Sequence, residues 1–245
     1  MYMRVLAIAV LLALLIWAPG PAQPAAAYRV LVFTRTVGFR HDSIPDAIDA
    51  VTRLGAEHGF AVDATEDAST FNDAQLPAYA AVVFLLTTGD VLDDTQQAAF
   101  ERYIEGGGGF VGVHSATDTE YDWPWYGALV GTYFADHPPG TYDAAVRIEA
   151  TDDPATRDLP NPWLRNDEWY NFRSNPRSLP DVVVLASLDE SSYAGGTMSD
   201  HPIAWFHPFD GGRAWYTAGG HTRESYRDAS FLRHLLGGIS YATGV

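Results

Sequence analysis

Short apolar runs alternate with segments of helical periodicity in the first half of the chain, and this alternation restricts the fold more than any other feature. Each run is rich in Val, Phe and Leu and is bounded by polar loops, which is typical of a strand buried on both faces. The predicted strands cover residues 29–34, 60–64, 79–86 and 110–113, and the predicted helices cover residues 43–59 and 93–105. Strands that alternate with helices in this way predict a parallel sheet with helices on both faces.

The second half of the chain is less regular. Strands are predicted at residues 145–149, 182–187, 203–207 and 214–218, with helices at 122–129 and 230–241. The hydrophobic fraction of 47% suits a packed globular protein. There is no internal repeat, and no linker rich enough in Gly, Pro or Ser divides the chain. We therefore expect one α/β domain over residues 28–245.

The first 27 residues have the pattern of a secretory signal peptide. A basic residue, Arg4, precedes the apolar run from Val5 to Trp17, and three small residues end at Ala27. The run is short for a helix that spans a bilayer. The sequence thus predicts export with cleavage near Ala27, and a mature chain that is not held in a membrane.

Charge and composition exclude several kinds of chemistry. The formal net charge is −16, so a nucleic-acid partner is not expected, because phosphate binding needs clustered cations. The 15 basic residues are all Arg, so no lysine can form a Schiff base. The absence of Cys excludes disulfides, a thiolate nucleophile and thiolate-held metals.

Polar loops follow three of the predicted strands, at residues 35–42, 87–90 and 114–118. In an open parallel sheet, ligands bind beyond the carboxyl ends of the strands. Two of these loops carry His beside a carboxylate, which points to a site at this edge. The expected catalytic residues, acting as acids, bases or ligands, are His41, His114, Asp118, Glu168 and His221. The expected substrate-binding residues are Arg40, Ser115, His137, Trp169, Tyr170 and His201.

Each of these residues also has an ordinary structural interpretation. A lone His often makes a structural hydrogen bond, and the aromatic residues could fill the core. His58 and His207 look like surface or turn residues, and His234 looks like a packing residue. No His-x-His or His-Glu-x-x-His pair exists, so a divalent metal such as zinc, iron or manganese would need ligands from distant loops. Candidate ligands are His41, Asp118, His114, His137, Glu168, His201 and His221.

Residues 112–116, Gly-Val-His-Ser-Ala, are similar to the turn that exposes a nucleophile between a strand and a helix. Here His114 stands at the nucleophile position, and Ala116 replaces the second glycine. A covalent hydrolase using Ser115 is an alternative that this imperfect match does not favour. The glycine run 106–109 precedes a strand and is followed by no Lys, so we expect it to end a helix and not to bind phosphate.

An ordered set of segments resembles the ThuA-like (trehalose utilisation) family. The matching segments are residues 36–44, 110–118, 131–134, 137–138, 167–170, 201–205, 216–222 and 237–239. The resemblance implies a flavodoxin-like fold of the class I glutamine amidotransferase type. Because the chain has no Cys, amide hydrolysis through a thioester is excluded. The resemblance also implies a role with trehalose-like disaccharides or 3-keto sugars.

Two functions remain open from the sequence. The first is an exported carbohydrate enzyme, a hydrolase, lyase or isomerase, that uses His and carboxylate groups as acid and base. The second is an exported sugar-binding module without catalysis. Both take a small carbohydrate as ligand, and neither fixes the oligomeric state.

Overall fold

The computed structural model describes residues 26–245. Of the expected leader, residues 1–27, all but the last two positions lie outside the described residues. Within the described part of the chain, no helix is both long enough and apolar enough to cross a membrane.

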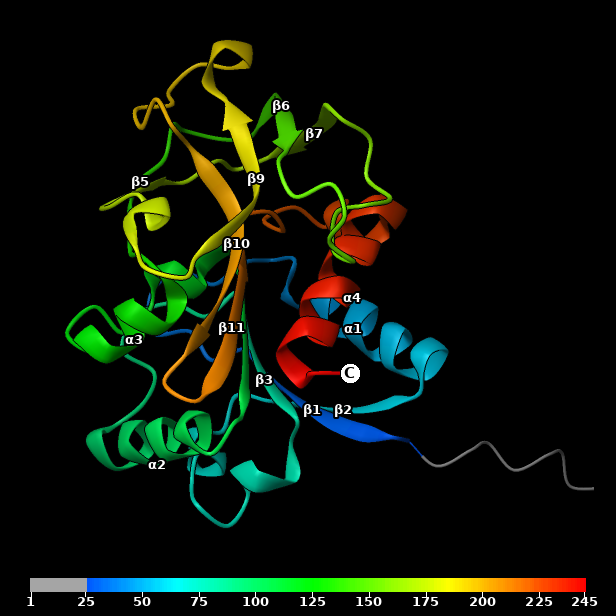
Figure 1. Cartoon of the computed structure of the whole chain (residues 1–245). Helices are drawn as coiled ribbons and strands as arrows, with labels where there is room; N and C mark the ends of the chain where they lie inside the picture. The colour runs from blue at the N-terminus through cyan, green and yellow to red at the C-terminus, as the bar shows by residue number, and fades with distance from the viewer. Residues whose placement is uncertain (1–25) are drawn as a thin grey trace, which may run out of the picture.

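A nine-stranded sheet runs through the whole molecule (Figure 1). Its strands, from one edge to the other, are β2 (Phe60–Thr65), β1 (Tyr28–Phe33), β3 (Ala81–Leu85), β4 (Gly109–Val113), β11 (Gly212–Thr217), β10 (Pro202–Phe209), β9 (Val183–Asp189), β6 (Tyr142–Ile148) and β7 (Trp163–Asp167).

The sheet has a parallel part and an antiparallel part that meet at β11. Strands β2, β1, β3, β4 and β11 are parallel to one another. Strands β10, β9, β6 and β7 continue the sheet with antiparallel pairing. Strand β11 is therefore parallel to β4 on one side and antiparallel to β10 on the other. The carboxyl ends of β1, β4 and β11 lie at the same edge of the sheet.

Within residues 26–245, four α-helices cover the two faces of the sheet. They are α1 (Ile44–His58), α2 (Asp94–Glu105), α3 (Pro124–Val130) and α4 (Ala229–Thr243). Helices α1 and α4 lie on one face, and α2 and α3 lie on the other (Figure 1). On the second face, Phe84 of β3 packs against Phe100 of α2 and Tyr126 of α3, with ring centroids 5.5 Å apart in both pairs. On the first face, Gly238 lets α4 approach Trp215 of β11 closely.

Shorter elements shape the region around the carboxyl ends of the strands. A 3-10 helix, η3, covers His114–Asp118 directly after β4. A two-stranded sheet pairs β5 (Phe134–Asp136) with β8 (Asn171–Phe172). The antiparallel part and this small sheet together bring residues 134–172 toward the ends of the parallel strands.

The predicted α/β fold and the order of its main elements are confirmed. The antiparallel part is larger than expected, because β7, whose sequence Trp-Leu-Arg-Asn-Asp alternates poorly, was not predicted as a strand. His234 is buried in α4, as expected. His207 is not a surface residue. It is 4% exposed, and its Nε2 bonds to the carbonyl of Leu129.

Candidate functional site: a histidine and carboxylate cluster

Four side chains from distant segments meet at the carboxyl ends of the strands. His41 lies in the loop after β1, His114 directly after β4, Glu168 directly after β7, and His221 in the loop after β11. Each offers one nitrogen or oxygen atom, and these four atoms lie within 4.8 Å of one another. We call these four residues the His/Glu cluster.

Three contacts between nitrogen and oxygen atoms of the cluster have short, similar distances. Nε2 of His114 is 3.4 Å from Oε2 of Glu168. Nδ1 of His221 is 3.1 Å from the same oxygen and 3.3 Å from Nε2 of His114. The ring of His41 stands edge-on to the rings of His114 and His221, with centroids 4.9 and 5.1 Å away. The cluster is therefore compact, and its atoms converge on a common point.

The backbone of His114 is unusual, and its ring is fixed. Its φ of 51° lies in the left-handed region, which non-glycine residues seldom adopt and which often marks functional sites. Nδ1 of the ring is 2.8 Å from the carbonyl oxygen of Ala218. Because a carbonyl only accepts, Nδ1 carries the proton and directs Nε2 into the cluster. The ring of Tyr170 covers His114 at 4.3 Å.

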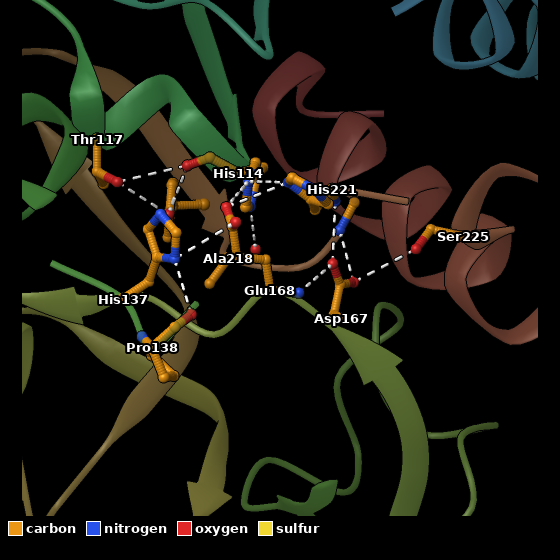
Figure 2. A network of polar contacts seen from close by, with 11 residues as sticks. His114, Thr117, His137, Pro138, Asp167, Glu168, Ala218, His221 and Ser225 are labelled. Atoms are coloured by element: carbon orange, nitrogen blue, oxygen red, sulfur yellow. Dashed lines mark hydrogen bonds and ion pairs between the residues drawn. The ribbon is translucent and has the colours of Figure 1, made fainter. Parts of the chain in front are cut away.

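Asp167 fixes the relative positions of the two segments that carry Glu168 and His221 (Figure 2). Its carboxylate accepts hydrogen bonds from the backbone N–H groups of Gly220, His221 and Glu168. The guanidinium of Arg165 also donates to it, at 2.5 Å, and both side chains are nearly inaccessible to solvent. Gly220 has a φ of 111°, which suits glycine and lets the chain turn sharply before His221.

One side of the cluster faces solvent. The side chains of His41 and His114 are buried, whereas that of His221 is 25% exposed and that of Glu168 is 10% exposed. His137 lies beside them, with its side chain 33% exposed and its Nδ1 3.4 Å from Oε1 of Glu168 (Figure 2). A molecule from solvent can thus approach the cluster past His137 and His221.

The pKa values of the groups in the cluster are shifted in different directions by their surroundings. Burial, together with repulsion from His114 and His221, lowers the pKa of His41 to about 2. Burial would raise the pKa of Glu168, but the adjacent imidazole rings of His114 and His221 hold it well below its ordinary value. Burial also opposes charge on His221, yet its contact with Glu168 raises the pKa of that ring. At neutral pH, Glu168 is ionised and His41 is neutral.

Three predicted site residues lie outside the cluster. Asp118 ends η3, and its carboxylate accepts a 2.6 Å hydrogen bond from Tyr121. Burial raises its pKa. Arg40 makes an exposed ion pair with Glu66 at 2.6 Å. The hydroxyl of Ser115 is buried and has no hydrogen-bond partner. The structure therefore contradicts the alternative of an accessible Ser115 nucleophile.

Three further predicted residues are core residues rather than surfaces for a sugar ring. Trp169 is fully buried, and its indole N–H donates to the carbonyl of Tyr142. Tyr170 is 3% exposed and packs beneath His114. His201 is buried, with Nδ1 bonded to Glu190 and Nε2 bonded to the carbonyl of Tyr170. For Trp169 and His201 the expectation of direct ligand contact is wrong, because their polar atoms and faces are already occupied by the protein.

The structure also adds three residues to the site. Asp167 was visible in the sequence only as a neighbour of Glu168, and nothing there indicated that it would be buried. Phe39 is 66% exposed, and its ring meets that of His41 edge-on at 4.9 Å. Val37, two residues earlier, is 58% exposed. The presence of two apolar residues within the polar loop 35–42 could have suggested this apolar rim.

One pocket at the far edge of the sheet lacks this chemistry. A pocket of about 550 Å³ lies at the outer edge of the sheet, lined by β6 and β7 residues that include Leu164 and Asn166. It contains no histidine and no Glu. The His/Glu cluster is therefore the best candidate for a functional site within residues 26–245.

The fold and the cluster together define an α/β protein with a candidate ligand site at the carboxyl ends of parallel strands. The sequence model of the ThuA family, described as trehalose utilisation, matches residues 29–242. The chain therefore belongs to the ThuA family, as its sequence motifs indicated. A search of curated protein sequences found no match.

Solved structures support the same fold. A ThuA-like protein from Bacteroides uniformis superposes with a TM-score of 0.77 and 24% identity, covering 92% of this chain and 95% of the other. A ThuA-like protein from Parabacteroides merdae gives 0.69 and 19%, with coverage of 88% and 90%. A β-galactosidase from Bacillus circulans gives 0.57 and 16%, and there the similarity covers 90% of this chain but 32% of the enzyme. At these identities the likeness concerns the fold.

Proposed function

We propose that this protein is an exported enzyme of carbohydrate utilisation that acts on a disaccharide or its 3-keto derivative by proton transfer. The observation that carries the proposal is the convergence of His41, His114, Glu168 and His221 at the edge of the sheet where ligands of such folds bind. Membership of a trehalose-utilisation family supports a sugar as substrate. The signal-like segment at residues 1–27 supports export.

The chemistry of a keto sugar fits these groups. The carbon next to a carbonyl carries an acidic hydrogen. A neutral imidazole can take that proton, while the C–H electron pair moves into an enolate and a second group returns a proton. His137 is partly exposed and contacts Glu168, so it is placed to exchange a proton with a bound molecule. No covalent nucleophile is required for this chemistry.

The test is turnover of trehalose, related disaccharides and their 3-keto derivatives by wild-type protein and by Glu168→Gln. This variant keeps the shape of the side chain and removes its charge. We expect turnover to fall by a factor of about 10² or more. The matched control is Glu57→Gln, because Glu57 is exposed near the far end of α1. Equal turnover by Glu168→Gln and Glu57→Gln would refute the proposal.

A second function, sugar binding without catalysis, is favoured by the exposed apolar rim of Val37 and Phe39. Apolar faces of sugar rings stack on aromatic side chains. Calorimetry separates the two functions. If wild-type protein binds a sugar, Phe39→Ala weakens that binding, and no sugar in the panel is converted, the protein is a binding module.

A further inference from the structure

We propose that the His/Glu cluster is a binding site for one divalent transition-metal ion, held by His41, His114, Glu168 and His221. This inference deepens the proposed function at the same site. It does not depend on a carbohydrate substrate, because metal binding is measured without one.

The spacing of the ligand atoms fits a metal centre. Metal–nitrogen and metal–oxygen bonds of about 2.0–2.1 Å in tetrahedral geometry place neighbouring ligand atoms about 3.3–3.4 Å apart. The three distances among His114 Nε2, His221 Nδ1 and Glu168 Oε2 are 3.1, 3.3 and 3.4 Å. These three atoms therefore already form one triangular face of such a coordination shell.

The cluster also contains more hydrogen-bond acceptors than donors, and this favours a bound cation. The Nδ1 of His114 uses its proton on Ala218, so the neutral ring presents a lone pair at Nε2. That lone pair faces a carboxylate oxygen of Glu168 at 3.4 Å, and both are acceptors. His41 is 4% exposed, and its Nδ1 is buried without a hydrogen-bond partner. A single proton on Nδ1 of His221 cannot satisfy all of these acceptors at once, whereas a bound metal ion would.

The surroundings of the cluster match those of metal ligands in other proteins. A ligating His usually donates its second ring N–H to a carbonyl or carboxylate, which fixes the tautomer and orientation. His114 does so through Ala218. Asp167 fixes the backbone of both Glu168 and His221 through three N–H groups (Figure 2). The ligand positions are thus held by the protein itself.

The ligand types restrict the metal. Imidazole and carboxylate suit zinc, iron or manganese, whereas calcium and magnesium prefer oxygen ligands alone. A metal at this point would be reached from the exposed side of His221 and His137. Because His137 is not one of the four ligands, it is left free to transfer protons in the proposed reaction.

The experiment is a titration of chelator-treated protein with Zn²⁺ by calorimetry and with Co²⁺ by visible absorption. We expect one equivalent of Zn²⁺ to bind, and Co²⁺ to give d–d bands that Zn²⁺ abolishes. Glu168→Gln and His221→Asn should weaken binding of Zn²⁺ by a factor of about 10 to 100 or more. The matched control, His58→Asn, changes an exposed His about 20 Å along α1 from the site.

Several outcomes decide the matter. Absence of saturable Zn²⁺ binding overturns the proposal, as does binding that Glu168→Gln leaves unchanged. If His221→Asn does not fold, as judged by circular dichroism, the Co²⁺ spectrum of wild-type protein and its loss in Glu168→Gln decide alone. Sugar turnover that Glu168→Gln reduces, in a protein that binds no Zn²⁺, would support the proposed function and overturn this inference. Metal binding with no turnover of any sugar would support this inference and contradict the proposed function.

Discussion

At the scale of single residues, the site depends on a buried aspartate that belongs to no ligand set. Asp167 is fully buried, is paired with Arg165, and accepts three backbone hydrogen bonds. The guanidinium of Arg165 lies between the rings of Trp163 and Phe231, 4.6 Å from each centroid, and cannot turn to solvent. Loss of the carboxylate would leave a buried cation without its counter-charge.

We therefore expect Asp167→Asn to lower the free energy of unfolding by about 3–5 kcal/mol, the cost typical of breaking a buried ion pair from one side. Urea denaturation measures it. The control is Asp63→Asn, which breaks the exposed pair with Arg29 and should cost at most about 1 kcal/mol. Similar losses in the two variants would show that Asp167 contributes no more than a surface pair.

The residues of the site were only partly predictable from the sequence. His41 and His114 could be predicted as site residues because they lie in loops that follow strands, and the carboxyl ends of parallel strands share one edge. The sequence could not choose among seven candidate ligands, because the choice depends on side-chain directions set by distant contacts. His201 illustrates this, since its ring is turned toward Glu190 and Tyr170 instead of the cluster. For Trp169, the sequence left open whether the ring lies in the core or faces a ligand.

At the scale of elements, the contact between α4 and β11 positions the loop that carries His221. Gly238 of α4 lies directly over Trp215 of β11, and a Cβ at this glycine would be 2.4 Å from Cδ2 of the indole. In an exposed helix, replacing Gly by Ala stabilises by about 1 kcal/mol. Here the packing effect has the opposite sign and is larger, because an overlap with a fully buried ring must be relieved by moving the helix.

For Gly238→Ala we expect a net loss of about 1–3 kcal/mol in the free energy of unfolding. Thermal and urea unfolding provide the measurement. Arg233→Ala, on the exposed side of the same helix, should change stability little. A gain in stability for Gly238→Ala would mean that helix propensity outweighs packing at this contact.

The sequence predicted elements best where hydrophobic patterns were strong. The buried runs of β1, β3 and β4 were found because both of their faces are covered. Strand β7 was missed because it lies at the edge of the sheet and does not follow the usual alternation of apolar and polar residues. Trp163 is buried, but its apolar neighbour Leu164 is exposed. An edge strand with an exposed Leu and buried charges has no signature in a single sequence.

At the scale of the whole molecule, buried histidines make stability depend on pH. His234 is fully buried within α4, and burial lowers its pKa to about 4. The unfolded chain takes up this proton as the pH falls below about 6.5, while the folded protein does so only near 4. The unfolded state therefore binds more protons in this window, and stability is lost as the pH falls through it. His41 contributes with the same sign.

We expect wild-type protein to lose roughly 2 kcal/mol more than His234→Gln between pH 7 and pH 5, as a shift of this size implies. His41 is present in both proteins, so the difference between them reports His234 alone. Urea denaturation at the two pH values gives the numbers. Parallel pH dependence in the two proteins would contradict the buried, neutral state of His234.

The position of β11 between the parallel and antiparallel parts has one more consequence. His41 and His114 come from the parallel part, whereas Glu168 follows the outermost antiparallel strand, so neither part contains a complete ligand set. A chain cut at the exposed turn around Gly140 would give two pieces that each lack essential groups. Recovery of metal binding on mixing the pieces would then serve as a direct reporter of their reassembly through the pairing of β4 with β11.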